Sequence, residues 1–326
     1  MIFYASWKSC LGDGNLSSES MLVNLASIVS GVFPGGINMR AQRFTRAVTI
    51  CCLIAGGVGL VGCETNPYTG RRQLLMTSVS QEMQMGAQAY NQVRSDPKMR
   101  LSQDPREIEP VKRVAARIVE AAKRSKYAQM AQQFQWEVTV IKDDKTANAF
   151  ALPGGKMAVY TGIFPMAKTE AGLAAVMGHE VVHALARHGA ERMSQGQAAN
   201  VGMQVLGAAI GIGTKNPALG QVAMGALGVG AQVGVLLPFS RKHESEADYI
   251  GILLAADAGY DPRESVALWE RMGQASGGGG QSEFLSTHPS HDTRIEQLKE
   301  WMPEAMDIYQ KRTPMPTTPL PEVGGR

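Results

Sequence analysis

Residues 176–185 read Val-Met-Gly-His-Glu-Val-Val-His-Ala-Leu and predict a buried helix that carries three polar side chains. The residues around these three are apolar or small, so we expect one long helix over about 169–193. His179 and His183 are four residues apart, which places both imidazoles on one helix face, one turn from each other. Glu180 is turned by about 100° from His179 around the helix axis. The string therefore predicts two metal ligands with a carboxylate beside an open coordination position.

A surface helix with two solvated histidines is the alternative interpretation of this string. The neighbouring residues Leu173, Val176 and Leu185 argue against it, because a polar group on a semi-buried helix face needs a partner. A catalytic zinc ion takes three protein ligands and keeps one position for water, so a third ligand is expected further along the chain.

The third ligand is expected from a second helix. A third histidine from the same segment would follow His183 by six residues, with glycine three residues after His183, but Gly189 and Ala186 stand at these positions. His188 is therefore not the ligand of that pattern. Glu244, at the start of a later predicted helix, is the predicted third ligand.

Asp248 lies one turn after Glu244 and is predicted to accept a hydrogen bond from the second ring nitrogen of His179, which would fix its tautomer. Glu246 is turned by about 200° from Glu244, so these two carboxylates are not expected to serve one site. His243 is interpreted as a solvated neighbour.

The remaining pattern predicts a mainly helical α+β protein. Residues 134–141 and 149–160 are extended around a Pro-Gly-Gly turn and predict a small antiparallel sheet. Residues 196–238 are rich in glycine and alanine and are expected to form close-packed helices beside the site rather than a membrane span. Other helices are predicted at about 80–93, 105–124, 241–258, 262–272 and 291–311.

The N-terminal region has the layout of a secretory signal. Residues 1–38 carry no motif and are interpreted as an over-called start before Met39. A basic patch follows, and then an apolar run at 47–61 that is shorter than the roughly 20 residues of a membrane-spanning helix. Residues 60–63 read Leu-Val-Gly-Cys and resemble a bacterial lipobox, which implies cleavage before Cys63 and lipidation of that cysteine. An uncleaved signal anchor is the alternative.

Glu64, in place of the aspartate linked to inner-membrane retention, favours the outer membrane. The predicted location is therefore periplasm-facing, as a lipoprotein of the outer membrane of a Gram-negative bacterium. The other three cysteines, Cys10, Cys51 and Cys52, lie in the segment expected to be removed, so no disulfide is expected. The chain has 32 basic and 29 acidic residues, which gives no general electrostatic case for binding nucleic acid.

Several strings together resemble the M48 family of zinc peptidases, in the gluzincin group, over roughly residues 66–298. The zinc string alone indicates only a zincin, whereas residues 148–155, Asn-Ala-Phe-Ala-Leu-Pro-Gly-Gly, are much more specific. The other strings that carry the resemblance are Asn66-Pro67 with Thr69-Gly70-Arg71, Glu244 with Asp248, and Thr287-His288-Pro289.

This resemblance implies a zincin-like core around the active-site helix and one zinc ion per chain. It also implies an edge strand at Asn148, Ala149, Phe150 and Ala151 that pairs with extended substrate, where a plain hairpin turn is the alternative. The implied domain plan is a start and signal at 1–62, a tether at 63–79, a metallopeptidase domain at 80–312 and a disordered tail at 313–326.

His288 precedes a proline in a loop after a glycine linker and could swing toward the metal. Three roles are open for it: stabilising the oxyanion, occupying the fourth metal position so that the enzyme is latent, or none, as a histidine at a helix start.

The predicted activity is that of a zinc-dependent endopeptidase in which Glu180 is the general base. The resemblance, with a lipid tether, implies quality control of misfolded or stalled cell-envelope proteins. The alternative is a chaperone-like outer-membrane assembly factor with a latent zinc site, with the assembly machinery as its partner. A purely structural zinc site is weaker, because it would need a fourth protein ligand and would favour cysteine.

Overall fold

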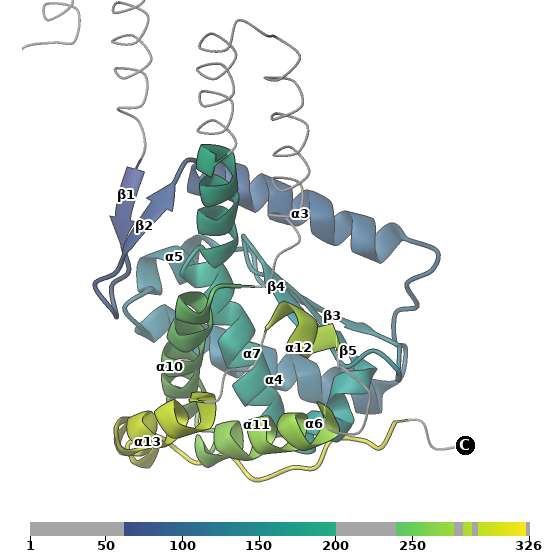
Figure 1. The fold of residues 1–326 in the computed structure, drawn as a ribbon. Coiled ribbons are helices and arrows are strands. Elements are labelled where there is room, and N and C mark those ends of the chain that lie inside the picture. The colour runs from purple at the N-terminus through teal and green to yellow at the C-terminus, as the bar shows by residue number, and fades with distance from the viewer. Residues whose placement is uncertain (1–61, 200–238, 277–282, 289–292, 324–326) are drawn as a thin grey trace, which may run out of the picture. The chain divides into compact units, whose positions relative to one another are not determined.

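The computed structural model describes residues 62–199, 239–276, 283–288 and 293–323 (Figure 1). The chain divides into two units, 1–60 and 61–326, and the described residues all belong to the second. The predicted signal segment and most of the glycine-rich stretch at 196–238 lie outside the described residues. Among the helices that are described, none is both long and apolar enough to cross a membrane.

A three-stranded sheet forms one part of the core. Its strands β3 (Glu137–Ile141), β4 (Ala149–Leu152) and β5 (Lys156–Tyr160) lie in the order β3-β5-β4. The β4 and β5 strands pair antiparallel across the Pro-Gly-Gly turn, as expected, but β3 pairs parallel to β5. The predicted sheet is thus present and mixed, and β4 lies at its edge.

The active-site helix α7 (Glu170–Leu185) is the centre of the helical part and contacts α10 (Arg241–Asp257), α4 (Pro105–Arg124) and β4 (Figure 1). Local signals place the starts of these helices: Asp104 caps α4 ahead of a proline, Thr169 caps α7 and Ser240 caps α10. The other helical elements are α3 (Val79–Ser95), α5 (Ala128–Gln133), η2 (Thr161–Ile163), α6 (Phe164–Ala167), α11 (Arg263–Ser276), α12 (Glu283–Thr287) and α13 (Arg294–Gln310).

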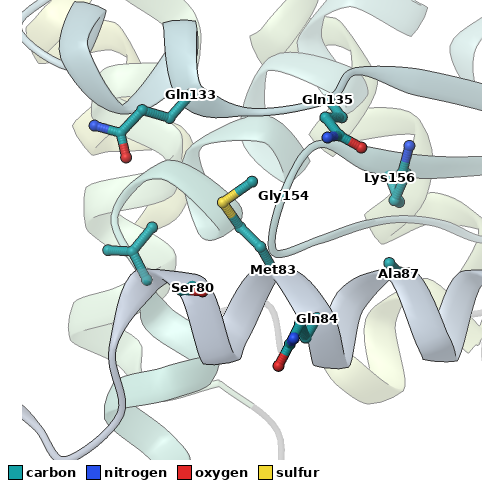
Figure 2. Close-up of a pocket in the computed structure, with 9 residues that line it drawn as sticks. Ser80, Met83, Gln84, Ala87, Gln133, Gln135, Gly154 and Lys156 are labelled. Carbon is teal, nitrogen blue, oxygen red and sulfur yellow. The ribbon is translucent and has the colours of Figure 1, made fainter.

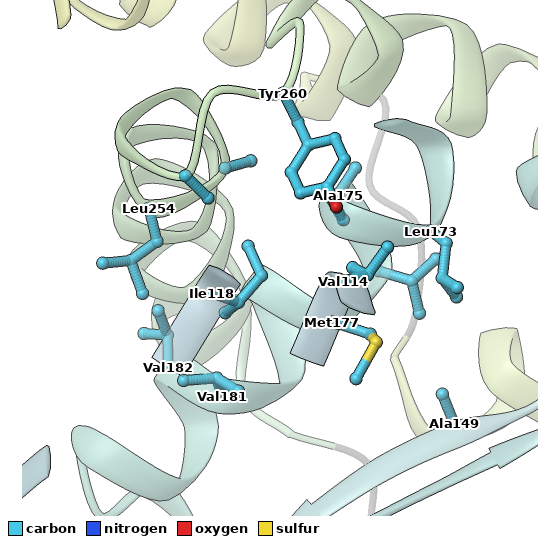
Figure 3. Packing of buried hydrophobic residues seen from close by; sticks show 14 of the residues in the cluster. Val114, Ile118, Ala149, Leu173, Ala175, Met177, Val181, Val182, Leu254 and Tyr260 are labelled. Carbon is cyan, nitrogen blue, oxygen red and sulfur yellow. The ribbon is translucent and has the colours of Figure 1, made fainter. Parts of the chain in front are cut away.

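Apolar side chains from these helices and the sheet pack into one main core (Figure 3). Val114 and Ile118 of α4 are fully buried, as are Leu173 and Val181 of α7. All residues of α7 are buried, which agrees with the nearly continuous apolar sequence around its three polar groups. The mainly helical α+β class and the zincin-like arrangement are therefore confirmed.

The long helix expected over 169–193 is interrupted. It ends at Leu185, and the chain is helical again from 188 to 199. Arg187 lies at the break with a φ of 56°, a left-handed conformation that is uncommon for residues other than glycine. Its guanidinium donates to both carboxylate oxygens of Glu82 and to the carbonyl of Thr77, which holds the break in place.

The segment predicted as a tether is folded onto the domain. Strands β1 (Gly62–Thr65) and β2 (Arg72–Leu75) form an antiparallel hairpin, in which Cys63 pairs with Leu74. Gln73 of β2 is buried and donates to the carbonyl of Ala186. The polar composition that suggested a free tether instead supplies hydrogen bonds to the domain, and no test of Cys63 lipidation comes from this pairing.

The tail expected to be disordered also packs, as far as residue 323. The Met315 N–H donates to the Gly259 carbonyl, and Leu320 is buried and donates to the Lys168 carbonyl. A proline-rich composition prevents regular structure but does not prevent an extended segment from pairing with the domain.

Candidate metal centre

Four side chains from three elements converge in the interior. The ligand atoms of His179, His183, Glu244 and His288 all lie within 4.8 Å of one another, and all four residues are buried. Glu244 Oε2 is 3.6 Å from His179 Nε2, and Glu244 Oε1 is 3.5 Å from His183 Nε2. The three residues predicted as ligands are therefore brought together, with His288 as a fourth member.

Unpaired polar atoms mark the place where a cation fits. Among the described residues, Glu180 Oε1, Glu244 Oε1 and His288 Nε2 are buried without a hydrogen-bond partner. Buried polar groups in proteins normally have partners, and a lone pair that lacks one is expensive to bury. Two imidazoles and a carboxylate form a donor set that zinc prefers, so these residues fit a zinc ion.

Asp248 contacts His179 in the predicted way. Its Oδ1 lies 2.9 Å from His179 Nδ1, which leaves Nε2 of that ring free to face Glu244. Burial acts to raise the pKa of Asp248, but the charge of Arg294 and the hydrogen bond with His179 outweigh it and hold the pKa below 3.8. Asp248 is thus an anion that orients the imidazole.

Arg294 is a site residue that sequence reasoning missed. It lies at the start of α13, is 1% exposed, and donates to Glu244 Oε2 at 2.6 Å and to Asp248 Oδ2 at 2.5 Å. Its guanidinium also lies 3.6 Å from the centre of the Trp269 ring. Only its place in the first turn of a predicted helix could have drawn attention to it. Its charge offsets two buried carboxylates that would otherwise repel each other.

Glu180 lies beside this cluster. Its carboxylate accepts a hydrogen bond from the backbone of Ala151 in β4, and its Oε1 is 3.4 Å from His288 Nε2. Burial raises the pKa of Glu180 to about 8, and a cation bound next to it would lower that value. A carboxylate in this position can take a proton from water and release it again.

His288 follows α12 and points into the cluster. Its backbone N–H donates to the Phe284 carbonyl, and its ring stacks on the Phe284 ring with centroids 4.5 Å apart. The expectation that this residue could reach the metal agrees with its position. The proline after it lies outside the described residues.

The residues predicted to bind substrate lie next to Glu180. Asn148 immediately precedes β4, and Ala149, Phe150 and Ala151 lie in it. Within the described part of the chain, β4 has a strand partner on one side only. The backbone of β4 is thus placed between the sheet and the proposed site of chemistry.

Two expectations about neighbours of Glu244 are wrong. His243 was expected to be solvated, but it is buried and its Nε2 lies 3.1 Å from Glu191. Glu246 was expected to serve no part of the site, but it lies 3.1 Å from Nε2 of His188, whose Nδ1 is 3.1 Å from Nδ1 of His183. Helix rotation separates Glu244 from Glu246 but does not say which neighbour fills the far side.

A pocket of about 350 Å³ lies elsewhere, between α3 and the turn that joins β4 to β5 (Figure 2). Met83 points across it toward Gly154, and its polar lining consists of Ser80, Lys156 and the side-chain amides of glutamines. None of the four clustered ligand residues lines it, so it is not the chemical site.

A buried pair of histidines on one helix, completed by a glutamate from the next helix and flanked by a free carboxylate, defines the zinc metalloendopeptidases. The description "Peptidase family M48" matches residues 107–302, and the chain belongs to this family.

Relatives of known name agree with this class. The mitochondrial metalloendopeptidase OMA1 of Schizosaccharomyces pombe is 39% identical over 81% of this chain and 76% of its own length. The protein of that name from Saccharomyces cerevisiae is 31% identical over 79% and 75%. The β-barrel assembly-enhancing protease of Escherichia coli O157:H7 is 30% identical over 72% of this chain and 47% of its own length.

These relatives overturn the predicted location. The two yeast proteins, which match most of the chain, are mitochondrial, so the assignment to the outer membrane of a Gram-negative bacterium is wrong, and a bacterial lipoprotein type is not supported. The prediction relied on a short apolar run and four residues, a pattern that arises readily outside its original context. Lipidation of Cys63 stays a prediction.

Proposed function

We propose that this chain hydrolyses peptide bonds in unfolded or misfolded proteins, with zinc bound by His179, His183 and Glu244. The observation that carries the proposal is the convergence of these three buried side chains, with Glu180 beside them and without a hydrogen-bond partner for its Oε1. Three protein ligands are what a catalytic zinc ion requires, as opposed to the four of a structural one.

A bound zinc ion supplies Lewis-acid activation of water and of the scissile carbonyl. The Glu180 carboxylate takes the proton of the attacking water and passes it to the leaving amine. Asp248 keeps His179 in the tautomer that presents Nε2, and Arg294 keeps Glu244 and Asp248 ionised and in place. These roles follow from the hydrogen bonds described above.

The substrate is extended polypeptide. The free edge of β4 offers backbone N–H and C=O groups that can pair with an added strand, and Ala151 connects this strand directly to Glu180. Backbone pairing selects for an unfolded segment and accepts many side-chain sequences. Asn148, Ala149, Phe150 and Ala151 are the proposed binding residues.

His288 regulates access to this site in the same proposal. Its unpaired Nε2 is close enough to the other ligand atoms to fill a fourth position, and in that arrangement water and substrate are kept out. This observation also favours a second candidate function, a latent zinc site in a factor for assembling outer-membrane proteins, which the name of the E. coli relative suggests.

The test compares wild type, Glu180→Gln and Glu170→Gln for zinc content and for cleavage of casein. Glu170 is a buried, arginine-paired glutamate at the other end of α7, so its variant controls for the loss of a buried carboxylate from the same helix. We expect Glu180→Gln to keep stoichiometric zinc and lose cleavage, and Glu170→Gln to keep both. A chain without zinc, or a Glu180→Gln variant that still cleaves casein, would refute the proposal. If wild type binds zinc but does not cleave casein even when His288 is replaced, the assembly factor is favoured.

A further inference from the structure

The turn between β1 and β2 has a fixed shape that the proposed reaction does not explain. Asn66 is buried, and its side-chain oxygen accepts hydrogen bonds from the backbone N–H groups of Tyr68 and Thr69 at 2.9 and 3.2 Å. Gly70 has a φ of 70°, which glycine adopts without strain. The backbone of Asn66 donates to the Arg71 carbonyl and so closes the turn. Thr69 and Arg71 are held in one orientation by these contacts.

Both of these side chains reach the same carboxylate. The Thr69 hydroxyl donates to Glu246 Oε1, and the Arg71 guanidinium donates to Glu246 Oε2 at 2.7 Å. Arg71 also forms a two-point ion pair with Glu191, at 2.6 and 2.8 Å. Glu246 is 5% exposed, so its position is set from the hairpin, more than 170 residues away in sequence.

The chain of contacts continues to the metal centre through His188. Glu246 Oε2 lies 3.1 Å from His188 Nε2, and His188 Nδ1 lies 3.1 Å from His183 Nδ1. A ligand histidine that binds metal through Nε2 carries its proton on Nδ1. His183 then donates to His188 Nδ1, and His188 donates its own Nε2 proton to Glu246. Every donor in this series meets an acceptor.

We propose that the turn at residues 66–71 is a positioning element of the metal centre, which acts through Glu246 and His188 to fix the ring and the tautomer of His183. The proposal rests on the proposed role of His183 as a ligand. Asp248 does the same for His179 in a single contact. The two imidazole ligands are thus each held by a carboxylate, one directly and one through a second histidine.

A purely structural role for the same contacts predicts a different result. If the turn only attaches the hairpin to the domain, loss of His188 lowers the stability of the metal-free protein but leaves the zinc affinity of the folded protein unchanged. The zinc dissociation constant therefore separates the two roles, whereas loss of activity or a lower Tm does not.

The first experiment replaces His188 with Phe and with Gln in the full chain. Phenylalanine fills the space but cannot accept the His183 proton, whereas the glutamine amide can accept it and donate to Glu246. We expect His188→Phe to raise the zinc dissociation constant, measured by competition with a chelator, by about 10–100-fold, and His188→Gln to restore most of it. Glu170→Gln is the matched control and should bind zinc as wild type does. The visible absorption of the cobalt(II)-substituted protein should shift in His188→Phe and return in His188→Gln.

The second experiment uses residues at the surface, in case His188→Phe does not fold. Thr69 is exposed and Arg71 is partly so, and Thr69→Val and Arg71→Met remove donors to Glu246 without opening the core. Both should weaken zinc binding, by less than His188→Phe does. Zinc affinities equal to that of wild type in these variants, or in folded His188→Phe, would overturn the proposal. Failure of wild type to bind zinc would instead overturn the proposed function, so the two outcomes are distinguishable.

Discussion

Gly178 of α7 faces Gly251 of α10 where the two helices are in contact. A Cβ atom on Gly178 would lie 2.9 Å from the Gly251 carbonyl oxygen, and one on Gly251 would lie 2.9 Å from the backbone nitrogen of His179. Real Cβ atoms do not approach backbone atoms so closely. The absence of both side chains therefore sets the spacing between the helix that carries two proposed ligands and the helix that carries the third.

Replacing Gly251 with alanine should push α10 away from α7. We expect Gly251→Ala to lower the free energy of unfolding by about 1–3 kcal/mol, the usual range for an overpacked core. Zinc affinity should fall as well, because Glu244 moves with α10. Denaturant unfolding and a zinc competition titration measure the two effects. Gly273→Ala in α11 is the control, because its Cβ would meet nothing within 4 Å. Wild-type zinc affinity in Gly251→Ala would contradict the argument.

Removing the charge of Arg294 should destabilise the metal-free protein more than the zinc-bound protein. Arg294→Met leaves the carboxylates of Glu244 and Asp248 buried without compensation, which costs roughly 3–5 kcal/mol when no metal is bound. A bound cation supplies part of the missing charge, so the loss should be smaller with zinc. Unfolding in denaturant, with excess chelator and with excess zinc, tests this difference. Equal losses in the two conditions would show that Arg294 acts elsewhere.

Chelation of the metal should lower the Tm of the wild-type protein, and added zinc should restore it. The reason is mass action: a ligand bound only by the folded state stabilises it by about 2.7 kcal/mol at a concentration of 100 times Kd. Glu180→Gln should show the same shift, because Glu180 is the proposed base and not a ligand, whereas Glu244→Gln should show a much smaller one. Thermal scans of the three proteins provide the measurement. A loss of the shift in Glu180→Gln would assign that residue to the metal.

His288→Ala should cleave casein faster than wild type while keeping its zinc. The alanine removes the group proposed to fill the fourth position and leaves the other three ligand residues intact. Initial rates of casein cleavage at equal zinc content test this. A variant slower than wild type would instead support stabilisation of the oxyanion by His288.

Glu246 should contribute to stability in a pH-dependent way. Burial acts to raise its pKa, but hydrogen bonds from His188, Arg71 and Thr69 outweigh this effect and lower the pKa from 4.5 to about 2. A carboxylate with a lowered folded-state pKa stabilises the protein above pH 4.5, and that contribution is lost as the pH falls toward 2. The difference in unfolding free energy between wild type and Glu246→Gln, measured in excess chelator, should therefore be large at pH 7 and small near pH 2. A difference independent of pH would rule out this contribution.

The agreement between sequence and structure is best where geometry is local. The bounds of α4 match the predicted 105–124, because Asp104 and Pro105 define a helix start with their own backbone and side-chain atoms. The spacing of His179 and His183 likewise fixes their common face without reference to any other element. The outer-membrane location, by contrast, rested on a short resemblance and was contradicted by the relatives of the whole domain.

The sequence by itself determined the active-site helix, its two histidines and its carboxylate, because residues one turn apart on a helix have a fixed relation. Only the tertiary structure decided that Arg294 neutralises Glu244 and Asp248, and that Glu246 reaches His183 through His188. These contacts join elements far apart in sequence, and their distances depend on how closely the helices pack. The hairpin and the tail belong to the same group: their polar and proline-rich residues look unstructured until the hydrogen-bond partners on the domain are in place.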